Sequence, residues 1–304
     1  MKRAARLRLS TSPGRWLLAL VVLMGAMLAF GQADLDDESP VVEQMTVAEL
    51  SKEVARELES LRRFEAYPLP DSEARRRTLE ARRDEKTIKA LKSIVSLAEG
   101  VLALPEDAPE REKLKQLMLL REGQIETAIV ERFESLTQRL NESLSRQSGL
   151  SGAELMSEEA FTDLLDKYRL SYLGLSTEQV LLRERLGIGD PELREKVVTT
   201  LNMYGEELIG VIHVHHHALK LLAARQAAAG TDSALLQSAR FEGERLQLAI
   251  SRLSSVVTLL ERLGGDTLVM RRVLIEKSGG LALSLVDTAM RCGVLAGPRD
   301  GGAD

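Results

Sequence analysis

The sequence predicts an all-α protein, built from elongated antiparallel helical hairpins that pack as a coiled-coil-like bundle. Aromatic residues make up 3% of the 304 residues and charged residues 29%, which suits long helices packed side by side better than a compact enzyme with a thick core. Glycine and proline fall between stretches of helical periodicity rather than within them. The sequence contains no alternating strand pattern of useful length.

The N-terminal segment has the pattern of an export signal. A basic start is followed by an uncharged run from Trp16 to Phe30, and then by small residues at Gly31 and Ala33. We expect residues 1–33 to be either a signal peptide cleaved after Ala33 or an uncleaved N-terminal membrane anchor, followed by an acidic leader at residues 34–45. In both cases the rest of the chain is expected in the periplasm or on the extracytoplasmic face of the inner membrane.

The distribution of charge argues against nucleic-acid binding. Residues 1–33 carry five of the 41 Lys and Arg residues and none of the 46 Asp and Glu residues, so their removal lowers the net charge from −5 to −10. Further along, the basic runs Arg75–Arg77 and Arg82–Arg83 are followed at once by Asp84 and Glu85. Phosphate contacts need clustered basic charge. The interleaved charges are instead expected to form a solvated helix face, and no nucleic-acid partner is expected.

Two helices are predicted directly after the acidic leader. Thr46 and Glu49 form a capping-box pattern at the start of the first helix, which ends before Tyr67–Pro70. The second helix begins near residues 71–72 and stops at Pro105. It is at first nearly all charge and then becomes amphipathic.

A third helix is predicted from Pro109 to about Arg146. Its apolar residues trace one stripe, made of Leu114, Leu117, Ile125, Ala128, Phe133, Leu136, Leu140 and Leu144. The second and third helices are expected to form an antiparallel hairpin, so residues 46–150 make up an N-terminal helical hairpin region.

The segment Gln147–Gly152 is predicted to be a soft boundary in the chain. It is followed by residues 151–189, where we expect short connecting helices at Ser157–Tyr172 and Thr177–Leu186. These short helices would link the N-terminal hairpin region to the last part of the chain.

A long helix pair followed by two short helices is predicted in residues 190–297. Asp190 at the cap position, Pro191 at the first helical position and an acid in the first turn favour initiation, and nothing breaks the helix until Gly230. A second long helix, capped at residue 231 or 232, is expected to run to about Leu263. Residues 298–304 are expected to be a disordered tail.

All four histidines lie between His213 and His217 in the first of these long helices. The predicted buried stripe of this helix consists of Val197, Leu201, Tyr204, Leu208, Val211, Leu219 and Leu222. At about 100° per residue, His215 falls within that stripe, whereas His213 and His217 point to the opposite side together with Glu206. Glu206, His213 and His217 are therefore candidate metal ligands, with ordinary surface histidines as the alternative. His215 is expected to be a polar core residue, with a pH sensor as the alternative.

The sequence offers no catalytic template. It contains no nucleophile elbow, phosphate-binding loop, dinucleotide-binding glycine motif or CxxC pair. Cys292 is the only cysteine, so no internal disulfide can form, and we expect a small buried hydrophobe at this position rather than a reactive thiol. No catalytic residue and no cofactor are assigned, and a hydrolase is disfavoured for want of a nucleophile arrangement.

The last third of the chain resembles the extracytoplasmic N-terminal helical region of large bacterial MscS-like mechanosensitive channels. The similarity lies in a long helix pair from Asp190 onward, followed by the segments Arg271–Gly280 and Leu285–Asp287. In such channels a similar segment leads towards the transmembrane helices. The resemblance implies a sensor-like region in the envelope and transfers no functional residue. Because no segment after Gly297 could cross a membrane, the pore of that family is absent from this sequence.

These observations lead to one functional expectation and one alternative. We expect a non-enzymatic, exported helical interaction or scaffold module of the bacterial envelope, which binds a protein partner or itself through its helix faces and associates with the inner membrane. Burial of Leu, Ile and Val is expected to organise the chain and to leave no concave pocket. The alternative is a periplasmic metal-binding or metal-responsive protein that uses Glu206, His213 and His217.

Overall fold

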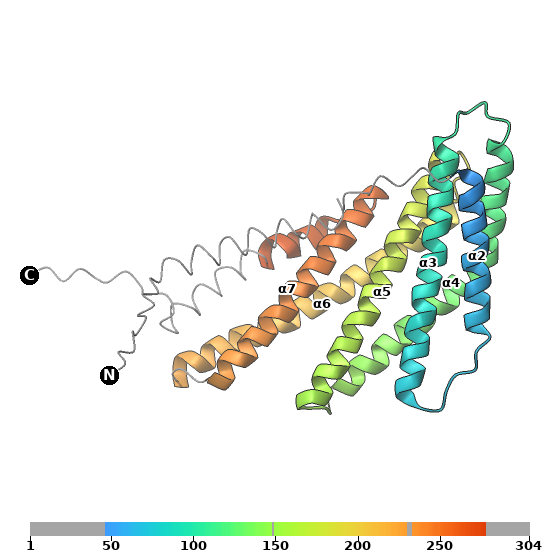
Figure 1. The fold of residues 1–304 in the computed structure, drawn as a ribbon. Helices are drawn as coiled ribbons and strands as arrows, with labels where there is room; N and C mark the ends of the chain where they lie inside the picture. Colours follow the sequence, from blue (N-terminus) through green and yellow to red (C-terminus); the bar gives the residue numbers. More distant parts are fainter. Residues whose placement is uncertain (1–45, 148, 230–232, 278–304) are drawn as a thin grey trace, which may run out of the picture. The chain divides into compact units, whose positions relative to one another are not determined.

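The structure is a computed structural model that describes residues 46–147, 149–229 and 233–277, and within these ranges the chain forms α-helices and no strand (Figure 1). The all-α class is therefore confirmed. The helices are α2 (Val47–Glu65), α3 (Glu73–Ala103), α4 (Arg111–Gln147), α5 (Gly152–Arg185), α6 (Pro191–Ala229) and α7 (Ser233–Arg262). Residues 268–277 are helical as well. The predictions made for residues 1–45 and for residues 278–304, which include the second short helix, Cys292 and the tail, fall outside the described residues.

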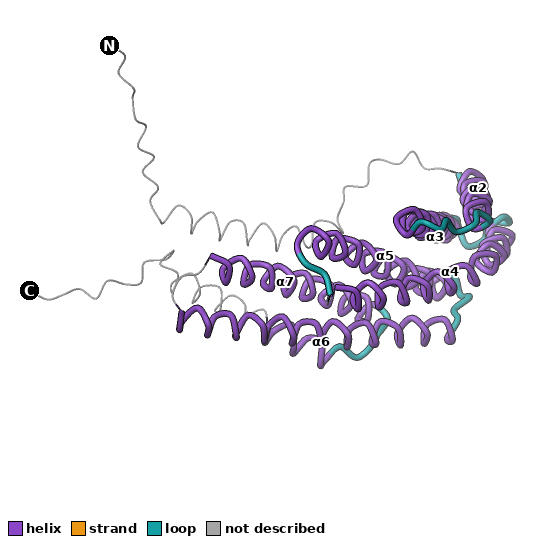
Figure 2. Tube along the Cα trace, turned by 90° about the horizontal axis from the view of Figure 1, so that it is seen from below, coloured by secondary structure: helices purple, strands orange, loops and turns teal. Residues whose placement is uncertain are grey.

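Neighbouring helices in the chain run antiparallel, and Figure 2 shows the loops that join them. In α4 and α5, Ser143 contacts Glu158 close to the connecting turn, and Glu122 contacts Arg183 at the far end of the pair. The same arrangement brings α3 against α2, α4 and α5. The predicted antiparallel hairpins are therefore present.

Two helix starts follow directly from their sequences. At the start of α2, the Glu49 amide donates to Oγ1 of Thr46 at 3.4 Å and the Thr46 amide donates to Oε2 of Glu49 at 2.8 Å, which is the predicted capping box. At the start of α6, Oδ1 of Asp190 accepts hydrogen bonds from two backbone amides of the first turn, both at 3.1 Å. Pro191 occupies the first helical position, where its missing N–H costs nothing.

The prediction of two short helices between residues 151 and 189 is wrong. Residues Gly152–Arg185 form the single 34-residue helix α5. Thr177 was expected to begin the second short helix, but its Oγ1 donates to the carbonyl of Leu173, one turn earlier, at 2.9 Å. This bond is compatible with the interior of a helix, and the nearby Gly174 weakens the helix without ending it.

The described residues divide into two compact units, and the division does not fall at the predicted boundary. The first unit holds residues 205–229, 233–255 and 268–277, and the second holds residues 46–147, 149–204 and 256–267. The segment Gln147–Gly152 is a tight turn inside the second unit, closed by hydrogen bonds from the amides of residues 149 and 150 to the carbonyls of residues 146 and 147. The segment does not separate two units because α4 and α5 pack against each other and share one apolar core.

The core of the second unit combines two apolar clusters. One is centred on α2, α3 and the start of α4, with Val54, Ile94 and Met118 fully buried. The other joins α3, α4 and α5 and includes Leu136 and Tyr172. The predicted stripe on α4 is buried at Ile125, Leu136 and Leu140, but Leu144 is 49% exposed. Burial of apolar helix faces therefore holds together much of this unit.

None of the helices in the described ranges combines the length and the apolar character that crossing a bilayer requires.

Candidate functional site

The histidines of α6 lie in the first unit and divide between two faces of the helix. His213 and His217 are exposed, whereas His215 is half-buried. Nδ1 of His215 lies 2.6 Å from Oε2 of Glu242 on α7, so this imidazole sits in the seam between the two helices and has a polar partner there. The division predicted from helical periodicity is confirmed.

The structure does not gather the three candidate metal ligands. Glu206, His213 and His217 are all exposed on α6. Glu206 precedes His213 by seven residues, which separates the two by about 10 Å along the helix axis. Among the residues that the structure describes, no three His, Cys, Asp or Glu side chains form a group that could hold a metal ion. The predicted three-ligand site is not formed, because one helix cannot bring residues two turns apart onto one ion.

A second apolar stripe runs along the exposed side of α6. Val211 is 41% exposed, Val214 65% and Leu221 50%, and the half-buried Ala218 completes a spacing of three and four residues. Val211 was predicted to lie in the buried stripe, but Ile212 is buried in its place. The structure therefore corrects the register of the buried face by one residue.

A charged residue stands at each end of this stripe. Glu207 precedes Val211 by four residues and Arg225 follows Leu221 by four, and both are exposed. Positions 207, 211, 214, 218, 221 and 225 thus repeat at intervals of four and three, which is the spacing of a coiled-coil seam. We call these six positions the α6 stripe.

The second unit contains a ladder of buried ion pairs between α3 and α4. Glu80, Arg83 and Asp84 of α3 are all buried. Glu80 binds Arg132 of α4 at 2.5 Å and Arg83 at 2.9 Å. The prediction that the charges around residues 75–85 form a solvated face is wrong at these positions, because the acids and bases of two facing helices pair inside the bundle.

The ladder continues to α5 through Glu158. Its Oε2 accepts from Nη1 of Arg77 at 2.7 Å, and its Oε1 accepts from Oγ of Ser143 at 2.6 Å. Oγ of Ser143 also lies 2.8 Å from Oγ1 of Thr162. Burial pushes the pKa of Glu158 upwards, but the hydrogen bonds from Arg77 and Ser143 outweigh it, so the pKa of Glu158 is lowered. This carboxylate is charged and ties three helices together.

Asp84 is the most deeply buried acid of the ladder, with 0% of its surface exposed. Its Oδ2 accepts from Nη2 of Arg139 at 2.7 Å, while its Oδ1 has no hydrogen-bond partner among the described residues. Burial raises the pKa of Asp84 from 3.8 to about 6, because the loss of water outweighs the attraction of Arg139. A pKa so close to neutrality makes the stability of this unit depend on pH.

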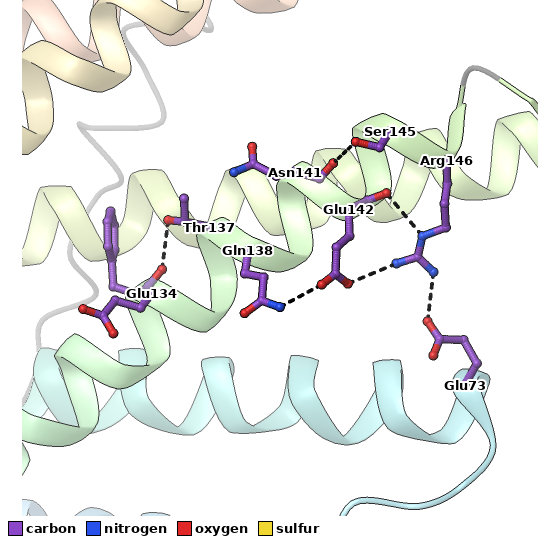
Figure 3. Close-up of a pocket in the computed structure, with 9 residues that line it drawn as sticks. Glu73, Glu134, Thr137, Gln138, Asn141, Glu142, Ser145 and Arg146 are labelled. Atoms are coloured by element: carbon purple, nitrogen blue, oxygen red, sulfur yellow. Dashed lines mark hydrogen bonds and ion pairs between the residues drawn. The ribbon is translucent and has the colours of Figure 1, made fainter.

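A shallow depression lies along one side of α4, with a volume of about 850 Å³ (Figure 3). Its polar side chains contact one another: Nε2 of Gln138 donates to Oε1 of Glu142 at 2.9 Å, and Nη1 of Arg146 donates to Oε1 of Glu73 at 3.1 Å. These contacts run along the helix surface instead of converging on one point. The depression has the character of a solvated helix face, and we assign it no binding role.

A better formed groove of about 500 Å³ lies between α4, α5 and the start of α6, inside the second unit. Its apolar lining comes from all three helices and consists of Leu119, Ile129, Val130, Phe133, Leu173, Leu193 and Val197. Its charged lining includes Glu122, Arg183 and Lys196. The expectation that helix packing leaves no concave pocket is therefore wrong for this unit. The sequence analysis missed Glu122, which stands between Met118 and Ile125 where the apolar stripe of α4 has a gap, and that gap is the signal that could have identified it.

Comparisons of the chain with protein-family models, with curated protein sequences and with solved structures found no match. The resemblance of the last third to the extracytoplasmic region of MscS-like channels stays a prediction. Roles for individual residues therefore rest on their geometry in this structure.

Proposed function

We propose that the protein is a non-enzymatic, exported helical interaction module of the bacterial envelope, which associates with a second copy of itself through α6. The observation that carries the proposal is the α6 stripe, whose three large apolar residues are between 41% and 65% exposed. Scattered exposed hydrophobes are common on protein surfaces, but a row with coiled-coil spacing suits a second helix.

The order of residues in the stripe favours an antiparallel pair of copies. If two α6 helices cross at residue 216, Val211 of one copy faces Leu221 of the other, and Val214 faces Ala218. The same register places Glu207 beside Arg225 of the second copy, once at each end of the seam. A parallel pair would instead place Glu207 beside Glu207 of the second copy and Arg225 beside its Arg225, where like charges repel.

The association is expected to be weak and to depend on concentration. Each copy contributes three large apolar side chains that are already partly buried, and each stabilises the pair by about 1 kcal/mol when covered. Such a contact has to overcome the cost of association, so only a small surplus remains and the dimer is expected to form only at high protein concentration.

Two sequence features support the placement in the envelope. The basic and then apolar start followed by an acidic leader is typical of exported chains. The resemblance to the sensor region of a mechanosensitive channel, without the pore, agrees with a role at the extracytoplasmic face of the inner membrane.

The metal-binding alternative is not proposed, because Glu206, His213 and His217 do not form a ligand group.

Sedimentation velocity tests the proposal directly. The exported protein is expected to shift from monomer towards dimer as its concentration is raised to about 1 mM, and Val214→Glu is expected to remove the dimer because it places two acids in the seam. Leu144→Glu is a matched control on the second unit, since Leu144 is 49% exposed and lies far along the chain from the stripe. A protein that stays monomeric at the highest concentration, or a dimer that Val214→Glu leaves intact, would overturn the proposal.

A further inference from the structure

The groove between α4, α5 and α6 contains a buried carboxylate whose hydrogen bonding is incomplete. Glu122 is only 6% exposed. Its Oε2 lies 3.4 Å from Nη1 of Arg183, a long contact, and its Oε1 has no hydrogen-bond partner in the described part of the chain. Buried acceptors in native proteins are nearly always satisfied, so a carboxylate oxygen without a partner, on a residue that lines a groove, indicates a missing donor.

The cations of the groove are already engaged by other acids. Arg183 places Nη2 at 3.5 Å from Oδ2 of Asp190, so its guanidinium is shared between two carboxylates. Nζ of Lys196 lies 2.8 Å from Oε1 of Glu192. Neither cation therefore completes the pairing of Glu122.

The groove as a whole has an excess of negative charge. Among the described residues, its lining includes the carboxylates Glu122, Glu126, Glu134 and Asp190 against the cations Arg183 and Lys196. Burial raises the pKa of Glu122, the charge of Arg183 and the nearby side-chain amide of Gln179 oppose this, and the neighbouring Glu126 and Asp190 raise it further. An added positive charge in the groove would stabilise the ionised form of Glu122.

The rest of the lining is apolar and defines the body of the missing group. Leu119, Phe133, Leu193 and Val197 present hydrocarbon surface from α4 and α6, and a volume of about 500 Å³ lies within the range of small-molecule sites. A hydrated metal ion would leave this surface uncovered. An organic anion would face the excess of carboxylates.

We propose that the groove is a binding site for an amphipathic organic cation, in which the apolar body packs between α4 and α6 and a protonated primary amine donates to Oε1 of Glu122. The amine supplies the donor that the carboxylate lacks. Oε1 is closed off from solvent, so the Glu122 side chain has to turn towards the groove to accept the amine, while Arg183 keeps its ion pair with Asp190. The site lies wholly within the second unit and is independent of the α6 stripe.

Gly123 offers a way to block the groove without disturbing the fold. It lies on α4 and lines the groove, and a Cβ added there would meet no atom within 4 Å in the part of the chain that the structure describes. Gly123→Leu would place its side chain into the space that the ligand body occupies. Replacement of a helical glycine also favours the helix, so this variant is expected to remain folded.

Isothermal titration of the exported protein with n-octylammonium tests the proposal, with octanoate and octanol as probes of the same length. Saturable binding of octylammonium, at least tenfold weaker binding of octanol and none of octanoate are expected. Glu122→Gln should weaken octylammonium binding at least tenfold, and Gly123→Leu should abolish it. Glu131→Gln, at an exposed position of α4 outside the groove, should have no effect.

Two outcomes would overturn the assignment. One is equal binding of octylammonium and octanoate, and the other is the absence of octylammonium binding below about 10 mM, the weak end of specific recognition. If Glu122→Gln does not fold, Gly123→Leu decides: a folded variant that binds as tightly as the natural protein would exclude this groove.

Discussion

The ion pair between Asp84 and Arg139 allows the packing of the second unit to be tested by one substitution. Arg139→Met keeps an apolar side chain about as long as the arginine stem but removes the guanidinium. Asp84 is fully buried, and its Oδ1 already has no hydrogen-bond partner among the described residues. Without Arg139, which lies 2.7 Å away, the carboxylate would be buried without its direct partner. Breaking such a pair on one side costs about 3–5 kcal/mol.

The loss should depend on pH, because Asp84 has a pKa of about 6 in the folded protein. At pH 7 its carboxyl is mainly ionised and the full loss is expected. At pH 5 it is mainly protonated, and Arg139→Met should cost about 1 kcal/mol less, because only the ionised carboxylate loses a charged partner. Urea denaturation followed by far-UV circular dichroism at both pH values measures the free energy of unfolding.

Arg63→Met is a matched control. Arg63 pairs with Glu59 on the surface of α2 and its side chain is 74% exposed, so its loss should cost less than about 1 kcal/mol at either pH. The double variant Asp84→Leu with Arg139→Met should recover most of the stability, since replacing both partners by apolar groups is often neutral. If Arg139→Met costs no more than Arg63→Met at pH 7, or if its cost is the same at pH 5, the buried pair does not hold the unit together as argued.

Three further predictions concern pH, charge pairing and the backbone. Because the folded pKa of Asp84 is raised from 3.8 to about 6, the protein should lose up to about 3 kcal/mol of stability as the pH rises from 4 to 7, and Asp84→Asn should flatten this dependence in urea denaturation curves. Glu207→Arg should weaken the dimer in sedimentation at least fivefold, and the addition of Arg225→Glu should restore it; a double variant as weak as the single one would count against the antiparallel register. Gly187 has a φ of 72° after the end of α5, so Gly187→Ala should lower the free energy of unfolding by about 1 kcal/mol, and an unchanged urea midpoint would contradict the left-handed turn.

The helix ends could be predicted from sequence because their causes are local. The capping box at Thr46 and the cap formed by Asp190 before Pro191 depend on residues within one turn. The position of His215 in the seam with α7 also followed from the helical repeat alone.

The buried charges of α3 could not be recognised by residue type, but their spacing contained a signal. Counting back by heptads from Leu91 and Ile94, the same face of α3 passes through Thr87, Asp84 and Glu80, all of which are buried. Charged residues were assigned to solvent because isolated charges are costly to bury. The partners that remove this cost, such as Arg139, lie more than 50 residues away, and a single sequence does not reveal that pairing.

The register of α6 shows a second limit of sequence reasoning. This helix carries apolar residues on two sides, and periodicity alone does not tell which side contacts α7. Val211 and Ile212 are adjacent, and only the structure shows that Ile212 is buried and Val211 exposed. The exposed stripe was hidden for the same reason, because Val211, one of its residues, was counted towards the core.

Cross-linking between two copies tests the proposed self-association most directly. One tagged copy carries Val211→Cys and a differently tagged copy carries Leu221→Cys, both with Cys292→Ser so that the introduced thiol is the only one. Mixed under mild oxidation, these copies should form a heterodimeric disulfide between positions 211 and 221, whereas copies with cysteine at His213 should not cross-link. A 211–211 disulfide as abundant as the 211–221 one, or no disulfide above the level seen at His213, would contradict antiparallel association through α6.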